Sequence, residues 1–287
     1  MRDAVVERVA VGFFDGVHVG HQAILRRATR AFTFRNHPLS VLAPERAPRL
    51  IMSPEAKVAA MRACGVDEVE VADFTAETAA LAPEEFALRH LVRGEERPVV
   101  VCGENWRFGA GGRGDAALLR EMGFEVNVVP YAVYDGAAVS SSRIRICLES
   151  GEVEAANEML GRPYSVSGAR FRGKGLGSRI GFPTVNLELP REPGFLLPNG
   201  VYEVSVGGVR AIANAGVAPT LGDGAWKEPV VEIHFPGAGE GVPAADGPIE
   251  VSFLRFIRPE RKFDSVDALK RQISEDIRLI QRDNSLS

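Results

Sequence analysis

Cysteine is scarce in this sequence, and the three that occur lie far apart. They are Cys64, Cys102 and Cys147, an odd number without the spacing of a metal site. Such a set excludes a disulfide framework and a cysteine-based metal centre. We therefore expect the three thiols to act as small buried hydrophobic groups in a protein of a reducing compartment.

Long hydrophobic runs and an excess of positive charge are also missing. No segment approaches the roughly 18 apolar residues of a membrane helix, and residues 1–3 lead into a strand-like segment without a signal-peptide core. The formal net charge is -4, with 45% apolar and 25% charged residues, which is ordinary for a globular protein. We expect a cytoplasmic protein that binds neither nucleic acid nor membranes, and its oligomeric state stays open.

The length of 287 residues favours two domains, because one core usually serves about 100 to 150 residues. The pattern changes at Gly161-Arg162-Pro163, so we place the domains at 1–160 and 161–287. In the first half, short apolar runs alternate with helical periodicity, which predicts a doubly wound, Rossmann-like α/β fold with a parallel sheet. The predicted strands are 8–12, 31–34, 68–72, 99–102 and 125–130. Helices should begin after Ser53 and at Pro83, with further helix over 140–160 broken at Ser150-Gly151.

The second half has short alternating strands and predicts a small antiparallel β-barrel or sandwich. Residues 201–206 and 209–213 flank Gly207-Gly208, a two-residue hairpin signal. A helix from about Asp264, the expected N-cap, should close the chain and pack on the barrel, since apolar residues recur there at helical spacing. The stretch 236–248, rich in Gly, Ala and Pro, predicts a loop.

The sharpest signal in the first half is the segment Val11-Gly-Phe-Phe-Asp-Gly-Val-His-Val-Gly-His-Gln22. It leaves the first predicted strand and enters the first predicted helix. His18 and His21 can there reach a phosphate that also meets free backbone N–H groups and the positive end of the helix dipole. When one phosphate attacks another, the protein needs to supply only positioning and charge neutralisation.

This segment resembles the signature of the HxGH nucleotidyltransferases, in the form found in bacterial bifunctional riboflavin kinase/FAD synthetases. Segments 33–38, 103–109 and 140–145 extend the resemblance. It implies that His18 and His21 stabilise the pentavalent phosphorus and the departing pyrophosphate. The other implied contacts are the ATP pocket (Gly12, Phe13, Asp15), the phosphates (Ser141, Ser142, Arg145), and the nucleotide or flavin phosphate (Asn105, Arg107).

A glycine-rich segment, Gly173-Lys-Gly-Leu-Gly-Ser-Arg-Ile-Gly-Phe-Pro-Thr-Val-Asn186, opens the second constellation. Its glycines, from Gly173 to Gly181, allow backbone N–H groups to approach phosphate, and Lys174 adds positive charge. If 183–187 is a strand, Thr184 and Asn186 project from one face and offer two neutral oxygen ligands to Mg²⁺ and a polyphosphate.

Residues 181–187 resemble the signature of riboflavin kinases, and further matches continue through residue 263. The resemblance implies that Glu232 is the general base on the ribityl 5′-hydroxyl, a role that suits a carboxylate within hydrogen-bond reach of an alcohol. His234, two residues on, has a supporting role. Arg258 is expected to contact flavin or nucleotide, with a surface ion pair as the alternative.

The two resemblances together predict an enzyme that phosphorylates riboflavin to FMN and adenylylates FMN to FAD, with ATP as co-substrate and Mg²⁺ as cofactor. Several residues depart from the family pattern, including Arg35, Asn36 and Asn105 in the first half and Ala218 in the second. Three alternatives therefore stay open: a riboflavin kinase with an impaired adenylyltransferase domain, a non-catalytic flavin-nucleotide-binding protein, and a nucleotidyltransferase with another acceptor.

Overall fold

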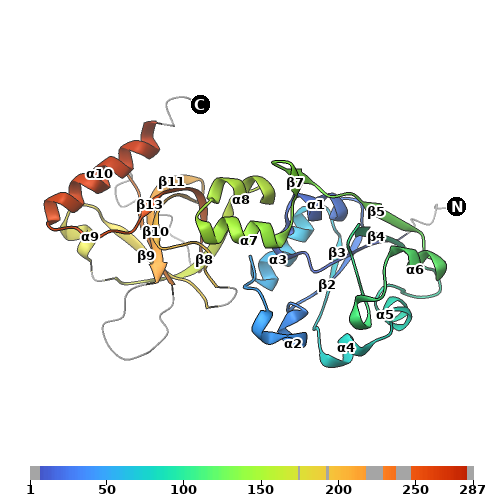
Figure 1. The fold of residues 1–287 in the computed structure, drawn as a ribbon. Coiled ribbons are helices and arrows are strands. Elements are labelled where there is room, and N and C mark those ends of the chain that lie inside the picture. Colours follow the sequence, from blue (N-terminus) through green and yellow to red (C-terminus); the bar gives the residue numbers. More distant parts are fainter. Residues whose placement is uncertain (1–6, 174, 192–193, 218–228, 237–246, 283–287) are drawn as a thin grey trace. The chain divides into compact units, whose positions relative to one another are not determined.

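The structure is a computed structural model that describes residues 7–173, 175–191, 194–217, 229–236 and 247–282. By its internal contacts the chain divides into two compact units, Met1–Ser141 and Ser142–Ser287. Figure 1 shows an α/β arrangement in the first unit and a β-rich arrangement in the second. Among the described residues, no helix combines the length and the apolar character needed to cross a membrane.

The first unit is built on a parallel sheet with the strand order β3-β2-β1-β4-β5. Every expected strand is present, with bounds that differ by at most one residue at either end. The strands are β1 (Arg8–Val11), β2 (Arg30–Phe34), β3 (Glu68–Ala72), β4 (Val99–Gly103) and β5 (Val126–Val129). This confirms the Rossmann-like fold class, and the carboxyl ends of all five strands meet at one edge of the sheet.

Both faces of this sheet are buried, as a parallel sheet requires. Val9 and Val11 of β1 join one apolar cluster, whereas Ala10 between them joins another. The first cluster includes residues of α5 (Pro83–His90) and α6 (Ala116–Glu121). The second includes residues of α1 (Val19–Leu25) and α3 (Pro54–Ala63). The helices therefore cover opposite faces of the sheet.

Helix boundaries follow local capping chemistry. The Ser53 hydroxyl accepts the N–H of Ala56 at 3.2 Å, so α3 begins at Pro54 as expected. The smaller elements of this unit are α2 (Leu39–Leu42), α4 (Ala76–Ala80), three 3₁₀ turns (Asp15–Val17, Pro44–Arg46, Ala110–Gly112) and the hairpin strands β6 (Val133–Tyr134) and β7 (Ala137–Ala138). The helix expected over 140–160 is present as α7 (Ser141–Ser150) and α8 (Val153–Leu160).

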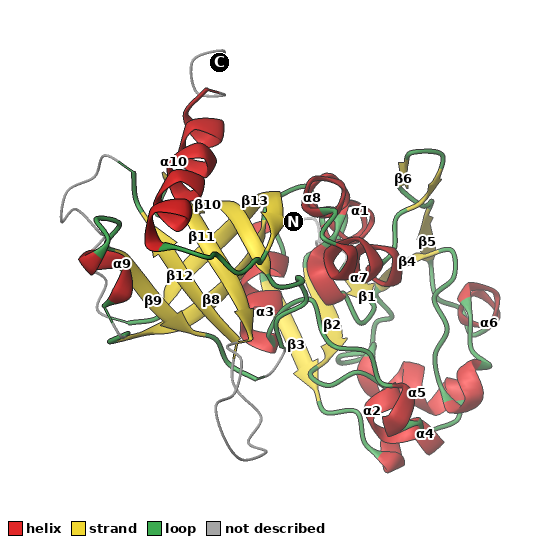
Figure 2. Cartoon of the chain, turned by 60° about the vertical axis from the view of Figure 1, so that its left-hand side comes forward, coloured by secondary structure: helices red, strands yellow, loops and turns green. Residues whose placement is uncertain are grey.

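The second unit is a closed antiparallel barrel with the order β10-β11-β12-β9-β8-β13 (Figure 2). This confirms the predicted barrel. Its strands are β8 (Tyr164–Phe171), β9 (Thr184–Glu188), β10 (Gly200–Val206), β11 (Val209–Val217), β12 (Pro229–His234) and β13 (Ile249–Pro259). Gly207 and Gly208 both have positive φ, 56° and 83°, and form the expected two-residue hairpin turn between β10 and β11. Most of the loop expected over 236–248 lies outside the described residues.

The closing helix α10 (Val266–Arg282) packs on the barrel. Its residues Ile277 and Ile280 join an apolar cluster with Val201 and Ile212. The expected N-cap, Asp264, is wrong by one position: the hydroxyl of Ser265 accepts the N–H of Ala268 at 3.1 Å. Serine is as good a cap as aspartate, so composition alone does not separate the two.

Cys102 and Cys147 are buried and all three cysteines are free thiols. Burial raises the pKa of the Cys102 thiol to about 11. That thiol is therefore neutral and unreactive at ordinary pH.

Candidate functional sites

A strained turn carries the paired histidines of the first unit. It joins β1 to α1 through residues 12–18, and two of its non-glycine residues, Phe14 and Val17, have positive φ of 57° and 41°. A β-branched residue rarely adopts this conformation, so the surrounding structure must hold it. Positive φ at such residues is typical of a site whose geometry is set for function.

His18 and His21 meet as their spacing predicts. Their rings stack with centroids 3.5 Å apart and an interplanar angle of 18°. His18 also caps α1, because its Nδ1 accepts the N–H of His21 at 3.3 Å. Both imidazoles therefore lie at the N-terminus of a helix, where an anion is favoured.

The environment holds His21 in its neutral form. Burial lowers the pKa of His21 well below its usual value, and the charges of His18 and Lys57 lower it further. Its Nδ1 is buried without a hydrogen-bond partner among the described residues. A bound phosphate would raise the pKa of His21 through its negative charge, and its oxygens could pair with the buried imidazole nitrogen.

The remaining residues expected in this turn mainly shape it. The carboxylate of Asp15, 2% exposed, accepts the N–H of Ile51 at 3.0 and 3.2 Å. The hydroxyl of Ser141 donates to the backbone oxygen of Asp15 at 2.9 Å. A Cβ on Gly12 would lie 3.0 Å from the ring of Phe14, so a side chain there is tightly restricted. Asp15 and Ser141 thus meet, and Asp15 acts as a tether.

Asn105 and Arg107 are both exposed and follow β4. Since β4 pairs in parallel with β1, they lie at the same sheet edge as the histidine turn. Ser142 and Arg145 lie one turn apart on α7, with Ser142 exposed and Arg145 buried. Contacts of these four residues with a ligand stay predictions.

Lys57 of α3 is a residue of this site that sequence reasoning missed. It is 3% exposed, and its ammonium donates to the backbone oxygens of Phe13 and Phe34 at 3.0 and 2.6 Å. The signal was present in the sequence: Lys57 lies one turn before Met61, on the apolar stripe of the helix. A charged residue in such a stripe is rarely buried without a partner.

In the second unit, glycines allow a loop to approach the barrel closely. A Cβ on Gly173 would lie 2.5 Å from the amide nitrogen of Asn186, and one on Gly177 would lie 2.4 Å from the oxygen of Phe182. Gly181 has a φ of 92°, which favours glycine for conformational reasons. Lys174 lies outside the described residues.

A cavity of about 630 Å³ opens beside this loop. Thr184 and Asn186 both line it, as the strand pattern predicts. Two arginines missed by sequence reasoning, Arg170 and Arg172, also line it. Their side chains, together with the glycine backbone, provide the positive environment that a polyphosphate needs.

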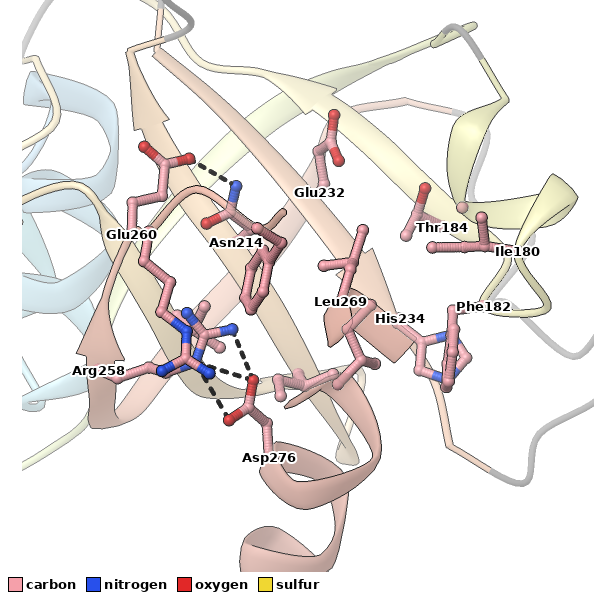
Figure 3. A pocket seen from close by; sticks show the side chains of 16 residues that line it. Ile180, Phe182, Thr184, Asn214, Glu232, His234, Arg258, Glu260, Leu269 and Asp276 are labelled. Carbon is pink, nitrogen blue, oxygen red and sulfur yellow. Dashed lines mark hydrogen bonds and ion pairs between the residues drawn. The ribbon is translucent and has the colours of Figure 1, made fainter. Parts of the chain in front are cut away.

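A second cavity of about 340 Å³ lies against the barrel beneath α10 (Figure 3). Its lining combines apolar and polar side chains, which suits an organic ligand with polar groups. The residues that line it are Gly177, Ile180, Phe182, Thr184, Val201, Ile212, Asn214, Glu232, His234, Arg258, Glu260, Arg261, Phe263, Leu269, Ile273 and Asp276. Thr184 lines both cavities.

Strand register aligns polar residues of the two cavities: Asn214 and Glu232 line the second cavity, and Asn186 lines the first. Asn214 of β11 pairs with Glu232 of β12, which in turn pairs with Asn186 of β9. Directly paired residues point to the same face of a sheet, so the three side chains form one row. His234 pairs with Thr184 in the neighbouring row, and its Nδ1 lies 2.9 Å from the oxygen of Pro183.

Glu232 remains accessible to solvent, as a base that meets a substrate must be. The surrounding protein nevertheless removes enough water to raise its pKa, and repulsion from Glu260 raises it further. Glu260 accepts a hydrogen bond from the amide of Asn214 at 2.9 Å. Figure 3 shows Glu232 between this Asn214–Glu260 pair and Thr184. The Asn214–Glu260 pair was not predicted from the sequence.

Arg258 lines the second cavity, but its nearest partner is Asp276 of α10. Its Nε and Nη2 donate to the Asp276 carboxylate at 2.7 to 3.1 Å. Asp276 is 1% exposed and also accepts from Gln272 at 2.7 Å. An ion pair, the alternative considered for Arg258, is thus present, but it is largely buried rather than on the surface. A flavin contact of Arg258 stays a prediction.

Two sites of separate construction, each suited to phosphate chemistry, define an enzyme with two transfer activities. Comparison with known families agrees: the FAD synthetase family matches residues 2–143, and the riboflavin kinase family matches residues 160–283. The chain belongs to the bifunctional riboflavin kinase/FMN adenylyltransferase family. It is accordingly an enzyme with a riboflavin kinase domain and an FAD synthetase domain.

Individual relatives match over nearly the whole chain. The bifunctional riboflavin kinase/FMN adenylyltransferase of Listeria monocytogenes is 33% identical, with 93% of this chain and 89% of the relative covered. The Escherichia coli enzyme of the same name is 32% identical, with 93% and 90% covered. A solved structure titled a macrolide-efflux protein from Streptococcus pneumoniae superposes with a TM-score of 0.84 at 28% identity, covering 96% of this chain and 94% of that one.

Proposed function

We propose that the barrel transfers the γ-phosphoryl group of ATP to riboflavin, and that the first unit transfers the adenylyl group of a second ATP to the resulting FMN. One observation carries the kinase assignment: Thr184 lines both cavities, and Glu232 lies on the wall of the second. A phosphate donor and an alcohol acceptor would therefore meet beside a carboxylate.

In the kinase reaction, riboflavin occupies the cavity of about 340 Å³ and the ATP phosphates occupy the cavity of about 630 Å³. Glu232 takes the proton of the ribityl 5′-hydroxyl as its oxygen attacks the γ phosphorus. ADP leaves with the electron pair of the broken P–O bond. The raised pKa of Glu232 makes it a stronger base than an ordinary carboxylate.

Thr184 and Asn186 fit a magnesium ion. Both line the donor cavity, and the missing Cβ of Gly173 lets the glycine-rich loop approach the Asn186 amide closely. A hydroxyl and an amide oxygen are hard neutral ligands of the kind that Mg²⁺ accepts alongside phosphate oxygens. When bound, the ion neutralises phosphate charge. Gly173, Lys174 and Gly181 are assigned to the phosphates because a glycine-rich backbone lets N–H groups approach phosphate and a lysine adds positive charge.

In the adenylylation reaction, an FMN phosphate oxygen attacks the α phosphorus of ATP, and pyrophosphate leaves. His18, His21 and the N-terminus of α1 stabilise the negative charge of that transition state. Gly12, Phe13 and Asp15 shape the ATP pocket. Phosphate contacts are assigned to Ser141, Ser142 and Arg145, and flavin-phosphate contacts to Asn105 and Arg107.

We further propose that the boundary between the two functional domains lies at residues 160/161, which is supported by the start of the riboflavin kinase match at residue 160. A cytoplasmic location, and the expectation that neither nucleic acid nor membranes are partners, rest on the sequence alone.

A chromatographic time course tests the assignment. Purified protein is incubated with riboflavin, ATP and Mg²⁺, and FMN and FAD are separated. We expect FMN and then FAD. Glu232→Gln should reduce FMN formation at least about 100-fold, as loss of a general base does. The exposed residue Glu250 of β13 supplies a matched control, Glu250→Gln, which should leave both products unchanged.

His21→Ala should reduce FAD formation from supplied FMN by about 100- to 1000-fold, the usual loss for one stabilising group of a transition state. Its rate of FMN formation should equal that of the wild type. FMN without FAD from the wild type would sink the adenylylation proposal, and saturable flavin binding without any product would sink both.

A further inference from the structure

The ammonium of Lys57 connects the ends of two neighbouring strands to the histidine turn. It donates to the oxygen of Phe34, the last residue of β2, and to the oxygen of Phe13, which follows β1. It also lies 4.1 Å from the centroid of the Phe13 ring. Burying an ammonium is costly unless it is fully engaged, so these contacts define its position closely.

The Phe13 peptide is held from two sides. The hydroxyl of Thr33 donates to the same Phe13 oxygen at 2.9 Å, and Lys57 donates at 3.0 Å. The residue that follows is Phe14, whose positive φ begins the strained part of the turn. Because a strained turn persists only where its neighbours hold it, the position of this carbonyl bears directly on the direction in which the turn leaves β1.

Charges from three elements surround the Lys57 ammonium: Asp15 of the 3₁₀ turn, Arg35 after β2, and His21 of α1. Burial lowers the pKa of Lys57 to about 8, Asp15 opposes this shift, and Arg35 adds to it. In return, the charge of Lys57 helps to lower the pKa of His21. Lys57 is therefore electrostatically coupled to the predicted catalytic pair.

We propose that Lys57 is a positioning residue for adenylyl transfer, which as an ammonium fixes the Phe13 carbonyl and thereby the turn that places His18 and His21. This inference rests on the proposed adenylylation. A purely structural role is the competing explanation. It predicts that Lys57→Met lowers the stability of the first unit, because the Phe34 carbonyl loses a donor, but leaves kcat for adenylylation unchanged.

The test compares Lys57→Met and Lys57→Arg with the wild type in the full chain, and uses Arg62→Met as the matched control. Arg62 lies on the exposed side of the same helix. We expect Lys57→Met to lower kcat for FAD formation from FMN by roughly tenfold to a hundredfold, the effect of a small misplacement of catalytic groups. FMN formation by the barrel of the same molecules, and both activities of Arg62→Met, should stay within twofold of the wild type.

The pH dependence of kcat for adenylylation distinguishes positioning by the charge of Lys57 from packing by its side chain. Wild-type kcat for adenylylation should fall as pH rises through about 8 or somewhat above, since bound phosphate favours the ammonium. Lys57→Met should lack this alkaline limb. Lys57→Arg keeps its charge at every accessible pH, so any activity it retains should persist to higher pH.

Stability should move in the opposite direction. The pKa of Lys57 is about 8 in the folded protein, against an ordinary value of 10.5. Between these values the unfolded chain binds more protons, so the stability of the first unit should rise with pH relative to Lys57→Met. Falling activity with rising stability is a combination that simple alkaline unfolding cannot produce.

The outcomes are distinct. Wild-type kcat in Lys57→Met, or an identical alkaline limb in all three proteins, would overturn the inference while leaving the adenylylation intact. Absence of FAD from the wild type would overturn both. If hydrogen exchange shows that β1 and β2 of Lys57→Met are unfolded, the pH profile of Lys57→Arg decides: an unmoved limb counts against the proposal.

Discussion

The two sites of this enzyme are built in opposite ways. The proposed adenylylation site is made mainly by one continuous segment, residues 12–21, whose turn is held in a strained shape by neighbouring elements. The proposed kinase site is assembled from separate strands whose register aligns Asn214, Glu232 and Asn186. A site of the first kind should fail as a unit, whereas one of the second kind should lose its properties one at a time.

Among variants that should impair one property of the barrel site, Gly173→Ala is expected to have the largest effect on kinetics. The added Cβ would lie 2.5 Å from the amide nitrogen of Asn186, so this amide or the glycine-rich loop must shift, and both line the donor cavity. We expect the KM for ATP in FMN formation to rise at least about tenfold, the cost of losing one or two good polar contacts. Steady-state kinetics at varied ATP measures this.

If the barrel site loses its properties one at a time, Gly173→Ala should leave riboflavin binding intact. Riboflavin affinity, measured by fluorescence quenching without ATP, should change less than twofold, and so should FAD formation from FMN. Loss of riboflavin binding together with ATP binding would contradict this expectation, because the barrel site would then fail as a unit, as the histidine turn is expected to.

An effect on stability as well as on binding is expected from Asp276→Asn. The substitution leaves the guanidinium of Arg258 without its charge partner in a largely buried setting. The second unit should lose about 2 to 4 kcal/mol of stability, somewhat less than a fully buried pair because Arg258 is partly exposed. Riboflavin affinity should fall with it, since both residues line the acceptor cavity.

Two measurements check Asp276→Asn. Denaturant unfolding monitored by hydrogen exchange should show the loss in β13 and α10, with β1 to β5 unchanged. Asp267→Asn at the exposed start of α10 is the matched control. Equal destabilisation by the two variants would contradict the role given to the buried pair.

The smallest effect is expected from Glu260→Gln, which keeps an acceptor for Asn214 but removes the charge that raises the pKa of Glu232. Glu232 must be ionised to act as a base, so kinase activity falls as pH decreases through its pKa. Removal of Glu260 lowers that pKa, so the acid limb of kcat for FMN formation should shift to lower pH. An unmoved limb would show that Glu232 and Glu260 do not interact.

The two sites also differ in how far they could be predicted from the sequence. In the first site, the contact between His18 and His21 could be predicted because the two residues are three apart at one helix end, whereas the roles of the site residues stay predictions. The strands of its sheet were equally clear, since apolar runs such as 99–102 are buried on both faces and bounded by turn residues. The position of Lys57 in an apolar stripe was visible in the sequence, but its partners depend on the fold, which brings α3 beside the end of β2.

The kinase site was predicted only in part. Thr184 and Asn186 could be paired because alternate residues of one strand share a face. Asn214 and Glu260 lie 46 residues apart, and Arg258 and Asp276 belong to different elements whose contact depends on how α10 packs. Such partners are set by register and docking, which no local pattern contains. The N-cap error at Asp264 has a local cause, because serine and aspartate cap equally well.

Because Thr184 lines both cavities, binding of one substrate can affect binding of the other. A side chain that borders both cavities cannot respond to one occupant without altering the surroundings of the other. Thermodynamic reciprocity then requires that whatever ATP does to the affinity for riboflavin, riboflavin does to the affinity for ATP by the same factor. Thr184 therefore provides a physical route by which ATP and riboflavin can bind cooperatively.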